Sequence, residues 1–212
     1  MKIATAFLMT LLHLSCIDTK PIFSIKEDYP RDEIKATHKK VAVLPVNYVT
    51  NADSENALEK MMDSNTDPLA RQEEKAHKYQ QMIYEELSIA NKQTDWLTAQ
   101  ATNNILKEKN INFQDIRQLS KSEIAKQLQV DAVIYFDFFF KTEAVSQTDA
   151  KSILLTNDDK KTVVEFTVEI YSAIEDNLIW KAKSTMSRQK IYSPTLFREL
   201  IGRQLEPVLP FN

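Results

Sequence analysis

The distribution of apolar residues predicts several extended segments. Residues 39–49, "KKVAVLPVNYV", form a short run rich in β-branched residues, which is typical of a buried strand. Pro45 lies inside this run and predicts that the strand ends or bulges there. Residues 131–140, "DAVIYFDFFF", form a continuous apolar and aromatic run, which predicts a central strand. Apolar and polar residues then alternate on both sides of "EDN" at 175–177, which predicts an antiparallel hairpin with one wet face.

The clearest helical pattern spans residues 67–91. Asp67 is a good N-cap, Pro68 suits the first helical position, and Asn91 fits the end of the helix. Between them, apolar residues recur at spacings of three and four, so one face of this helix is expected to enter the core. Shorter helical patterns occupy residues 101–110, 120–130 and 193–209.

The order of these elements predicts one α/β (α+β) domain over residues 39–212. Strand, long helix, a short strand at residues 95–100, short helices, central strand, hairpin and terminal helix together indicate a mixed sheet of about four to five strands with helices packed against it. The preceding residues 17–38 are polar and contain two prolines, which predicts a mostly irregular tether. The alternative is an N-terminal extension packed on the domain, with Ile22 and Phe23 as its contacts.

The first 15 residues have the form of a secretory signal peptide. Lys2 is followed by the apolar run "IATAFLMTLL", and no acidic residue precedes Asp18. This run is shorter than the roughly 20 apolar residues that a membrane-spanning helix needs. Cys16, the only cysteine, follows directly after Ser15, as in a bacterial lipobox. We therefore expect residues 1–15 to be a lipoprotein signal peptide and Cys16 to carry palmitate and other acyl chains. Two alternatives stay open, ordinary secretion and a buried or reactive thiol.

Composition excludes several function classes. Gly202 is the only glycine, so Gly-rich phosphate-binding loops and the G-x-S-x-G nucleophile elbow are absent. One cysteine excludes an intramolecular disulfide and a multi-cysteine zinc site. His13, His38 and His77 do not have the spacing of a helical metal pair, and a net charge of −3 does not favour nucleic acid. We predict no catalytic, cofactor or metal residues, and we predict that the protein is not an enzyme.

A few side chains still invite a chemical interpretation. Asp137 lies in the aromatic strand, where burial would raise its pKa and make it a candidate general acid; the simpler interpretation is that it points to the wet face or pairs with a lysine. Glu165 and Glu169 share one strand face and could hold a cation, although a solvated face is the simpler interpretation. An exposed Trp180 or Tyr171 would indicate a partner-binding patch. Asp131 is interpreted as a cap, His77 as an exposed side chain, and residues 157–161 as a turn.

Four sequence blocks together resemble a group of bacterial envelope lipoproteins. These blocks are "KKVAVLPV" after the cysteine, "MIYEELSIAN" at the end of the long helix, "LSKSEIAKQLQVDAVIYFDFF", and "EDNLIWKAKS" in the hairpin. Their domain is similar to the N-terminal domain of TolB, to the penicillin-binding-protein activator LpoB and to the curli-secretion lipoprotein CsgG. The resemblance covers about residues 39–208.

The resemblance implies a non-catalytic lipoprotein anchored in the bacterial envelope through Cys16. Its expected location is the outer membrane, on the periplasmic face or the surface. Its expected role is that of an accessory, scaffold or regulatory subunit that binds an envelope protein not identified by the sequence. One alternative is a subunit of a secretion or transport complex that associates with copies of itself. The other is a small ligand-binding or hydrolytic lipoprotein.

Overall fold

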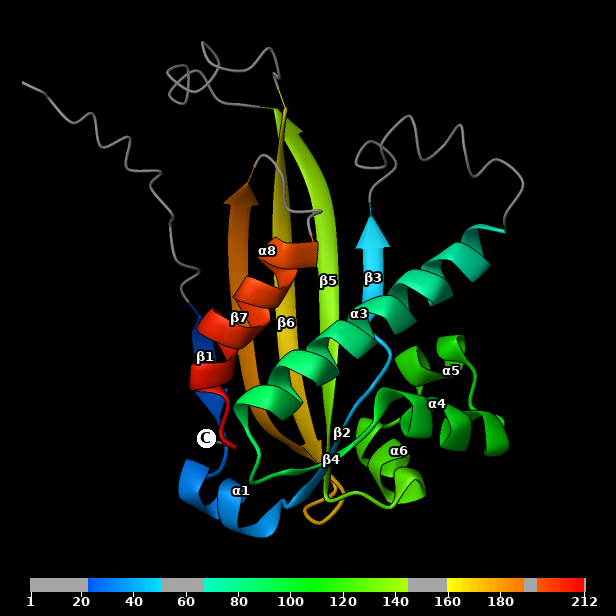
Figure 1. Cartoon of the computed structure of the whole chain (residues 1–212), viewed down its shortest axis with the longest axis vertical. Helices are drawn as coiled ribbons and strands as arrows, with labels where there is room; N and C mark the ends of the chain where they lie inside the picture. Colours follow the sequence, from blue (N-terminus) through cyan, green and yellow to red (C-terminus); the bar gives the residue numbers. More distant parts are fainter. Residues whose placement is uncertain (1–22, 51–66, 145–159, 189–193, 212) are drawn as a thin grey trace, which may run out of the picture.

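The centre of the molecule is a mixed seven-stranded sheet (Figure 1). The computed structural model describes residues 23–50, 67–144, 160–188 and 194–211. Six strands lie in the order β1-β7-β6-β5-β2-β4, and β3 pairs with β5 beyond the end of β2. The predicted fold class is confirmed, although the sheet is larger than the four to five strands expected. The strands are β1 (Ser24–Glu27), β2 (Lys40–Val43), β3 (Asn47–Thr50), β4 (Asp95–Leu97), β5 (Ala132–Ala144), β6 (Lys160–Ser172) and β7 (Leu178–Arg188).

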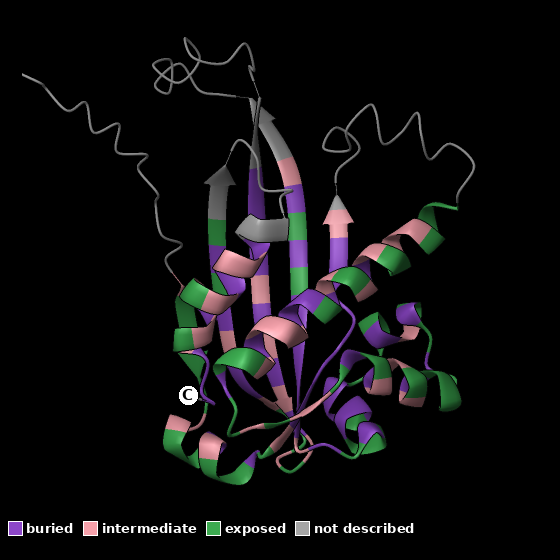
Figure 2. Ribbon diagram, in the orientation of Figure 1, coloured by how far each residue is buried: buried purple, intermediate pink, exposed green. Residues whose placement is uncertain are grey.

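Helices cover the two faces of the sheet unequally (Figures 1 and 2). On one face, α3 and the C-terminal helices seal a large core that includes the alternate side chains of β5, such as Phe136 and Phe138. On the other face, α4, α5 and α6 cover only one end, where they enclose a smaller core around Val133 and Tyr135. The helices are α1 (Arg31–Thr37), α3 (Pro68–Ala90), α4 (Ala99–Glu108), α5 (Phe113–Gln118), α6 (Lys121–Leu128), α8 (Pro194–Glu199), a π-helix (Leu200–Leu205) and a 3-10 turn (Glu206–Val208).

The long antiparallel ribbon of β5, β6 and β7 confirms the predicted hairpin. β5 and β6 pair over thirteen residues each, from Ala132↔Ser172 to Ala144↔Lys160. The turn between β6 and β7 contains Asp176 at φ 59°, a left-handed conformation that Asp adopts more readily than most residues. Alternation along this ribbon sends one set of side chains into the large core and the other set to the opposite face.

The caps predicted for the long helix are confirmed in α3. The Asp67 side chain accepts a hydrogen bond from the backbone N–H of Leu69 (3.1 Å), Pro68 opens the helix, and Asn91 is the C-cap. The apolar stripe of α3 buries Met82, Ile83 and Leu87, as the spacing predicts, while Leu69 at its start stays 39% exposed.

The structure places β1 and α1 inside the segment 16–38 that was expected to be an irregular tether. β1 pairs with β7 along the sheet edge, and the Phe23 ring meets the Phe166 ring edge-on at 5.4 Å. In α1, Ile34 is 1% exposed and belongs to the large core. The apolar contacts of this segment with the large core are Phe23, Tyr29 and Ile34, whose spacing follows neither a helix nor a strand period. The alternative of an extension packed on the domain therefore describes residues 23–38.

The break at Pro45 is confirmed, but the strand beyond it was not predicted. β2 ends at Val43, and the chain resumes as the separate strand β3 at Asn47, which pairs in parallel with β5. The short helix α5 was also missed, although Asn112 and Asp115 form a reciprocal capping box at its start. In the part of the chain that the structure describes, no helix is both long and apolar enough to cross a bilayer.

Candidate functional site

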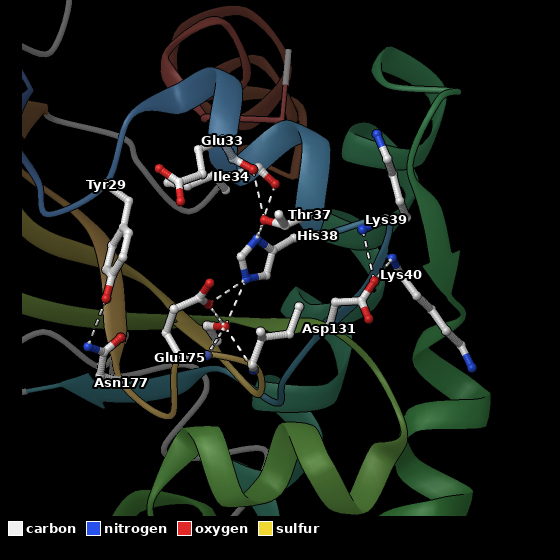
Figure 3. Close-up of polar contacts among 12 residues, drawn as sticks. Tyr29, Glu33, Ile34, Thr37, His38, Lys39, Lys40, Asp131, Glu175 and Asn177 are labelled. Atoms are coloured by element: carbon white, nitrogen blue, oxygen red, sulfur yellow. Dashed lines mark hydrogen bonds and ion pairs between the residues drawn. The ribbon is translucent and has the colours of Figure 1, made fainter.

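A largely buried polar cluster joins His38, Ser172 and Glu175, and Figure 3 shows the side chains of His38 and Glu175 facing each other. His38 follows α1, Ser172 ends β6, and Glu175 lies in the β6–β7 turn. His38 Nε2 is 2.8 Å from Ser172 Oγ and 3.1 Å from Glu175 Oε2. His38 Nδ1 is 3.1 Å from the carbonyl oxygen of Ile34 and 2.8 Å from Thr37 Oγ1. Each ring nitrogen therefore lies within hydrogen-bond distance of two oxygen atoms.

This cluster contains a serine, a histidine and an acid, but it lacks the geometry of a catalytic triad. In a triad the serine and the acid contact opposite ring nitrogens. Here Ser172 and Glu175 both contact Nε2, and Ser172 donates its own proton to the Glu175 carboxylate. Ser172 also accepts from the backbone N–H groups of Ile174 and Glu175, and it is fully buried. We conclude that the cluster holds the α1 segment against the β6–β7 turn.

The electrostatics of Glu175 agree with this structural role. Burial by itself would raise the pKa of Glu175, but the hydrogen bond from Ser172 and the nearby His38 outweigh it and lower the pKa. Beside the cluster, Asp131 Oδ2 accepts from the backbone N–H groups of Lys39 (2.9 Å) and Lys40 (2.8 Å) (Figure 3). Asp131 therefore caps the start of β2.

Among the described residues, α4–α6 leave part of the second face of the sheet uncovered. We call this part the open sheet face. On β5, Val133 and Tyr135 are buried under the helices, whereas Asp137 and Phe139, on the same side of the strand, are exposed. Phe139 is 38% exposed, which is unusual for a phenylalanine in a central strand. By register, the open sheet face comprises Asn47, Asp137, Phe139, Glu165, Thr167, Glu169, Lys181, Lys183 and Thr185.

Asp137 lies on this wet face, as its simpler interpretation predicted. Its Oδ1 accepts a hydrogen bond from Asn47 Nδ2 (2.8 Å), so its partner is an amide on the neighbouring β3. Partial desolvation raises the pKa of Asp137, with a smaller contribution from the negative Glu169, while the Asn47 bond opposes the shift. Asp137 is exposed on the sheet surface and lines neither of the two described pockets, so its surroundings do not favour the role of a general acid.

Glu165 and Glu169 are ion-paired with lysines across the strands. Glu165 contacts Lys141 Nζ at 2.7 Å, and Glu169 bonds to Lys181 across the β6–β7 hairpin. Glu169 also accepts from the Tyr171 hydroxyl (2.8 Å). With these donors in place, the two carboxylates form a charged sheet surface.

Where α6 meets the open sheet face, an amine packs on an aromatic ring. Lys121 Nζ lies 4.8 Å from the centre of the Tyr135 ring and donates to the carbonyl oxygen of Leu119 (3.0 Å). Burial lowers the pKa of Lys121 and raises the pKa values of Tyr135 and Tyr171. These side chains close the end of the sheet against water.

A separate cleft of about 680 Å³ lies between α3 and the α4–α5 region. His77 of α3, predicted as an exposed side chain, lines it, and its side chain is 37% exposed. His77 Nε2 is 3.6 Å from Glu73, and Nδ1 is 3.1 Å from Asn103 Nδ2. Asn103 in turn donates to the fully buried Gln80 (3.0 Å). The cleft therefore has a polar inner end fixed by side chains.

Several residues that the sequence singled out cannot be assigned to a site. Cys16 and residues 157–159 lie outside the described residues. Trp180 is fully buried and Tyr171 half-buried, so neither forms an exposed aromatic patch. Among the residues that the structure describes, no three His, Cys, Asp or Glu side chains are grouped to hold a metal ion.

Sequence reasoning missed the His38 cluster because its members are far apart in the chain. His38 lies 134 positions from Ser172 and 137 from Glu175, so no local spacing marks them. The cleft was missed for the same reason, since α3 and α5 contribute to it from distant segments. The alternation of β5 did contain a signal for the open sheet face, because Asp137 interrupts an otherwise apolar strand.

Comparison with known proteins yields structural neighbours only. No protein-family model matches the sequence, and no curated protein is similar to it at a significant level. The PelC dodecamer of Paraburkholderia phytofirmans is 13% identical, covers 89% of this chain and 98% of its own, and has a TM-score of 0.46. The lipoprotein GNA1162 of Neisseria meningitidis is 14% identical, covers 80% and 96%, and has a TM-score of 0.44.

LpoB is also among these neighbours. Its C-terminal domain from Escherichia coli is 16% identical, covers 74% of this chain and 93% of its own, and has a TM-score of 0.37. One of the proteins named from the sequence blocks is thus found again among the solved structures. At such identities and TM-scores, the likenesses transfer no activity, partner or assembly to this chain.

Proposed function

We propose that this protein is a non-catalytic lipoprotein of the bacterial envelope that binds another protein and acts as its accessory, scaffold or regulatory subunit. Cys16 carries the lipid anchor, most simply in the outer membrane. A multiply acylated cysteine anchors firmly, because each buried CH₂ contributes about 0.8 kcal/mol. The apolar run before Cys16 and the absence of acid before Asp18 support this step.

The anchor would hold the folded domain close to the bilayer. Ser24, the first residue of β1, follows Cys16 by eight residues. A fully extended chain gains at most ~3.5 Å per residue, so these residues reach about 28 Å. The β1 edge would then lie nearest the lipid, and the partner would be a protein within or beside the same membrane.

The open sheet face carries the proposal of protein binding. Three long strands present a surface there that none of the described helices covers, with the exposed Phe139 beside charged neighbours. Protein interfaces commonly combine an aromatic anchor with a polar rim. We expect this surface to be the contact with the partner.

Chemical cross-linking in native membranes, followed by capture of the full chain, tests this surface. Phe139→Asp with Lys183→Glu is expected to abolish the major cross-linked product, while urea unfolding shows a chain that stays folded at a cost of about 1–3 kcal/mol, because Phe139 is partly buried and the new carboxylate faces Glu165 on β6. Lys109→Glu is the matched control, because Lys109 is exposed at the end of α4, away from the open sheet face. If the double variant and the control retain the same product, the open sheet face is not the binding surface.

The anchor has its own test. Labelled palmitate is expected to enter the full chain and to be lost in Cys16→Ala, which should leave the membrane fraction. Incorporation that survives in Cys16→Ala would overturn the anchor.

A second copy of this chain is the alternative partner. Asp137 on β5, Thr167 on β6 and Lys183 on β7 lie side by side on the open sheet face. If two copies pack through this face about a two-fold axis parallel to β6, Asp137 of each copy lies opposite Lys183 of the other copy. Analytical ultracentrifugation of the full chain in detergent decides between a different partner protein and a second copy of this chain. A single protomer would exclude the self-associating subunit, and a defined oligomer that Lys183→Glu dissociates would favour it.

A further inference from the structure

The cleft between α3 and the α4–α5 region lies at a special position in the sheet. β2 and β4 are neighbouring parallel strands. The helix after β2 and β3 is α3, which packs into the large core through Met82 and Ile83. The helix after β4 is α4, which packs into the smaller core on the opposite face through Leu106. The connections from the two strands therefore leave to opposite sides of the sheet.

This arrangement opens a crevice for a physical reason. Where connections from adjacent parallel strands diverge, neither helix covers the carboxyl ends of the strands, and ligands of open α/β sheets bind there. The cleft is in that place, because Pro45, two residues beyond the end of β2, is part of its lining. Its volume of about 680 Å³ lies within the roughly 300–1,000 Å³ range of ligand pockets.

The inner end of the cleft is rigid. Gln80 is fully buried and donates to the carbonyl oxygen of Val43 (2.8 Å), which fixes it to the end of β2. Gln80 then holds Asn103, and Asn103 contacts His77. A preorganised polar end of this kind costs little entropy when a ligand binds.

The rest of the lining consists of apolar side chains at the walls of the cleft and asparagine amides at its rim. Leu106, Ile111 and Phe113 form apolar walls that are 3–8% exposed. Asn104 and Asn110 lie at the exposed rim. An asparagine amide offers both a donor and an acceptor, the same pair that a peptide group needs.

The charge and shape of the cleft further restrict the kinds of ligand that it can bind. Glu73 on the α3 side and Lys107 on the α4 side have opposite signs, so the cleft does not favour a strongly charged ligand such as a phosphate. Phe113, the only Phe, Tyr or Trp among the described lining residues, is 5% exposed, so it lacks an open ring face for a sugar or a nucleobase and contacts a bound side chain only together with the neighbouring Ile111.

We propose that this cleft binds a short, uncharged peptide segment that places one aliphatic or aromatic side chain against Ile111 and Phe113. Its backbone amides pair with the rim asparagines. The site goes beyond the proposed function, since α3, α4 and α5 build it without the strands of the open sheet face.

Titration of the ¹⁵N-labelled full chain in detergent micelles tests the site. The probes are N-acetylated, C-amidated Ala-Leu-Ala and Ala-Phe-Ala, with Ala-Lys-Ala, N-acetylglucosamine and inorganic phosphate as comparison probes. The two apolar peptides are expected to cause saturable amide shifts confined to residues 103–113 and to His77. Asn104→Tyr, which fills the cleft from an exposed position, is expected to weaken this binding at least about tenfold.

Gln100→Tyr is the matched control, because Gln100 is exposed on the same helix and does not line the cleft. It should bind the peptides like the unmodified chain. The proposal is overturned if no apolar peptide saturates, if the shifts lie elsewhere, if the sugar or phosphate gives them instead, or if Asn104→Tyr binds unchanged. None of these outcomes touches the open sheet face, which the cross-linking variants test separately.

Discussion

Replacing Glu175 with Gln removes the negative charge from the cluster that holds α1 against the β6–β7 turn. The Glu175 side chain is 20% exposed and His38 is 2% exposed, so solvent screens their contact only weakly. A hydrogen bond to a charged group contributes about 1.5–3 kcal/mol, and Gln retains one acceptor. We therefore expect Glu175→Gln to lower the free energy of unfolding by about 1–2 kcal/mol at neutral pH.

The pH dependence of this loss is set by the direction of the pKa shift. The folded state lowers the pKa of Glu175 from its ordinary value of 4.5. The carboxylate therefore stabilises the fold fully above pH 4.5, and this contribution is lost as pH falls through the folded-state pKa. Since Gln does not titrate, the difference between the two proteins should shrink toward zero at acidic pH.

Urea unfolding of both proteins, followed by tryptophan fluorescence, measures the effect. With a slope of about 2 kcal/mol/M, the midpoint should shift by roughly 0.5–1 M at neutral pH. Glu165→Gln is the matched control, because Glu165 is also ion-paired but 47% exposed, and it should cost less than about 1 kcal/mol. A Glu175→Gln cost that is independent of pH, or no larger than that of the control, would refute the reasoning.

Three further predictions concern other parts of the domain. Asp131→Ala should lower the free energy of unfolding by about 1–3 kcal/mol, because two backbone N–H groups lose their acceptor, and Asp131→Asn, which keeps an acceptor oxygen, should cost less. Asp137→Asn should stabilise the fold at neutral pH, because the folded state raises the pKa of this carboxyl, and the gain in stability should disappear as pH falls. Urea unfolding measured as a function of pH tests this, and a lower free energy of unfolding for Asp137→Asn at neutral pH would contradict it. Phe23→Ala should cost about 1–3 kcal/mol and speed amide hydrogen exchange in β1, because β1 loses the ring contact that joins it to Phe166 in the core. Unchanged exchange at Ile25 would show that the Phe23 contact does not hold the strand.

The sequence alone determined the elements whose residues repeat with a local period. The caps Asp67 and Asn91 bound α3 because capping is a contact between near neighbours in the chain. The alternation around residues 175–177 predicted the β6–β7 hairpin, because a side-chain period of two residues on both sides of a short turn is typical of two paired antiparallel strands. Pro45 marked the end of β2 because it has no backbone N–H to donate.

Only the tertiary structure decided which surfaces stay open and which distant residues meet. His38, Ser172 and Glu175 come together because α1 returns to the β6–β7 turn, and no spacing in the chain encodes that return. β1 pairs with β7 at the sheet edge, and its contact with the core through Phe23 and Phe166 leaves no periodic trace in the sequence. The cleft exists because the helices after β2 and β4 pack on opposite faces, and that choice depends on which apolar surfaces find each other in the folded chain.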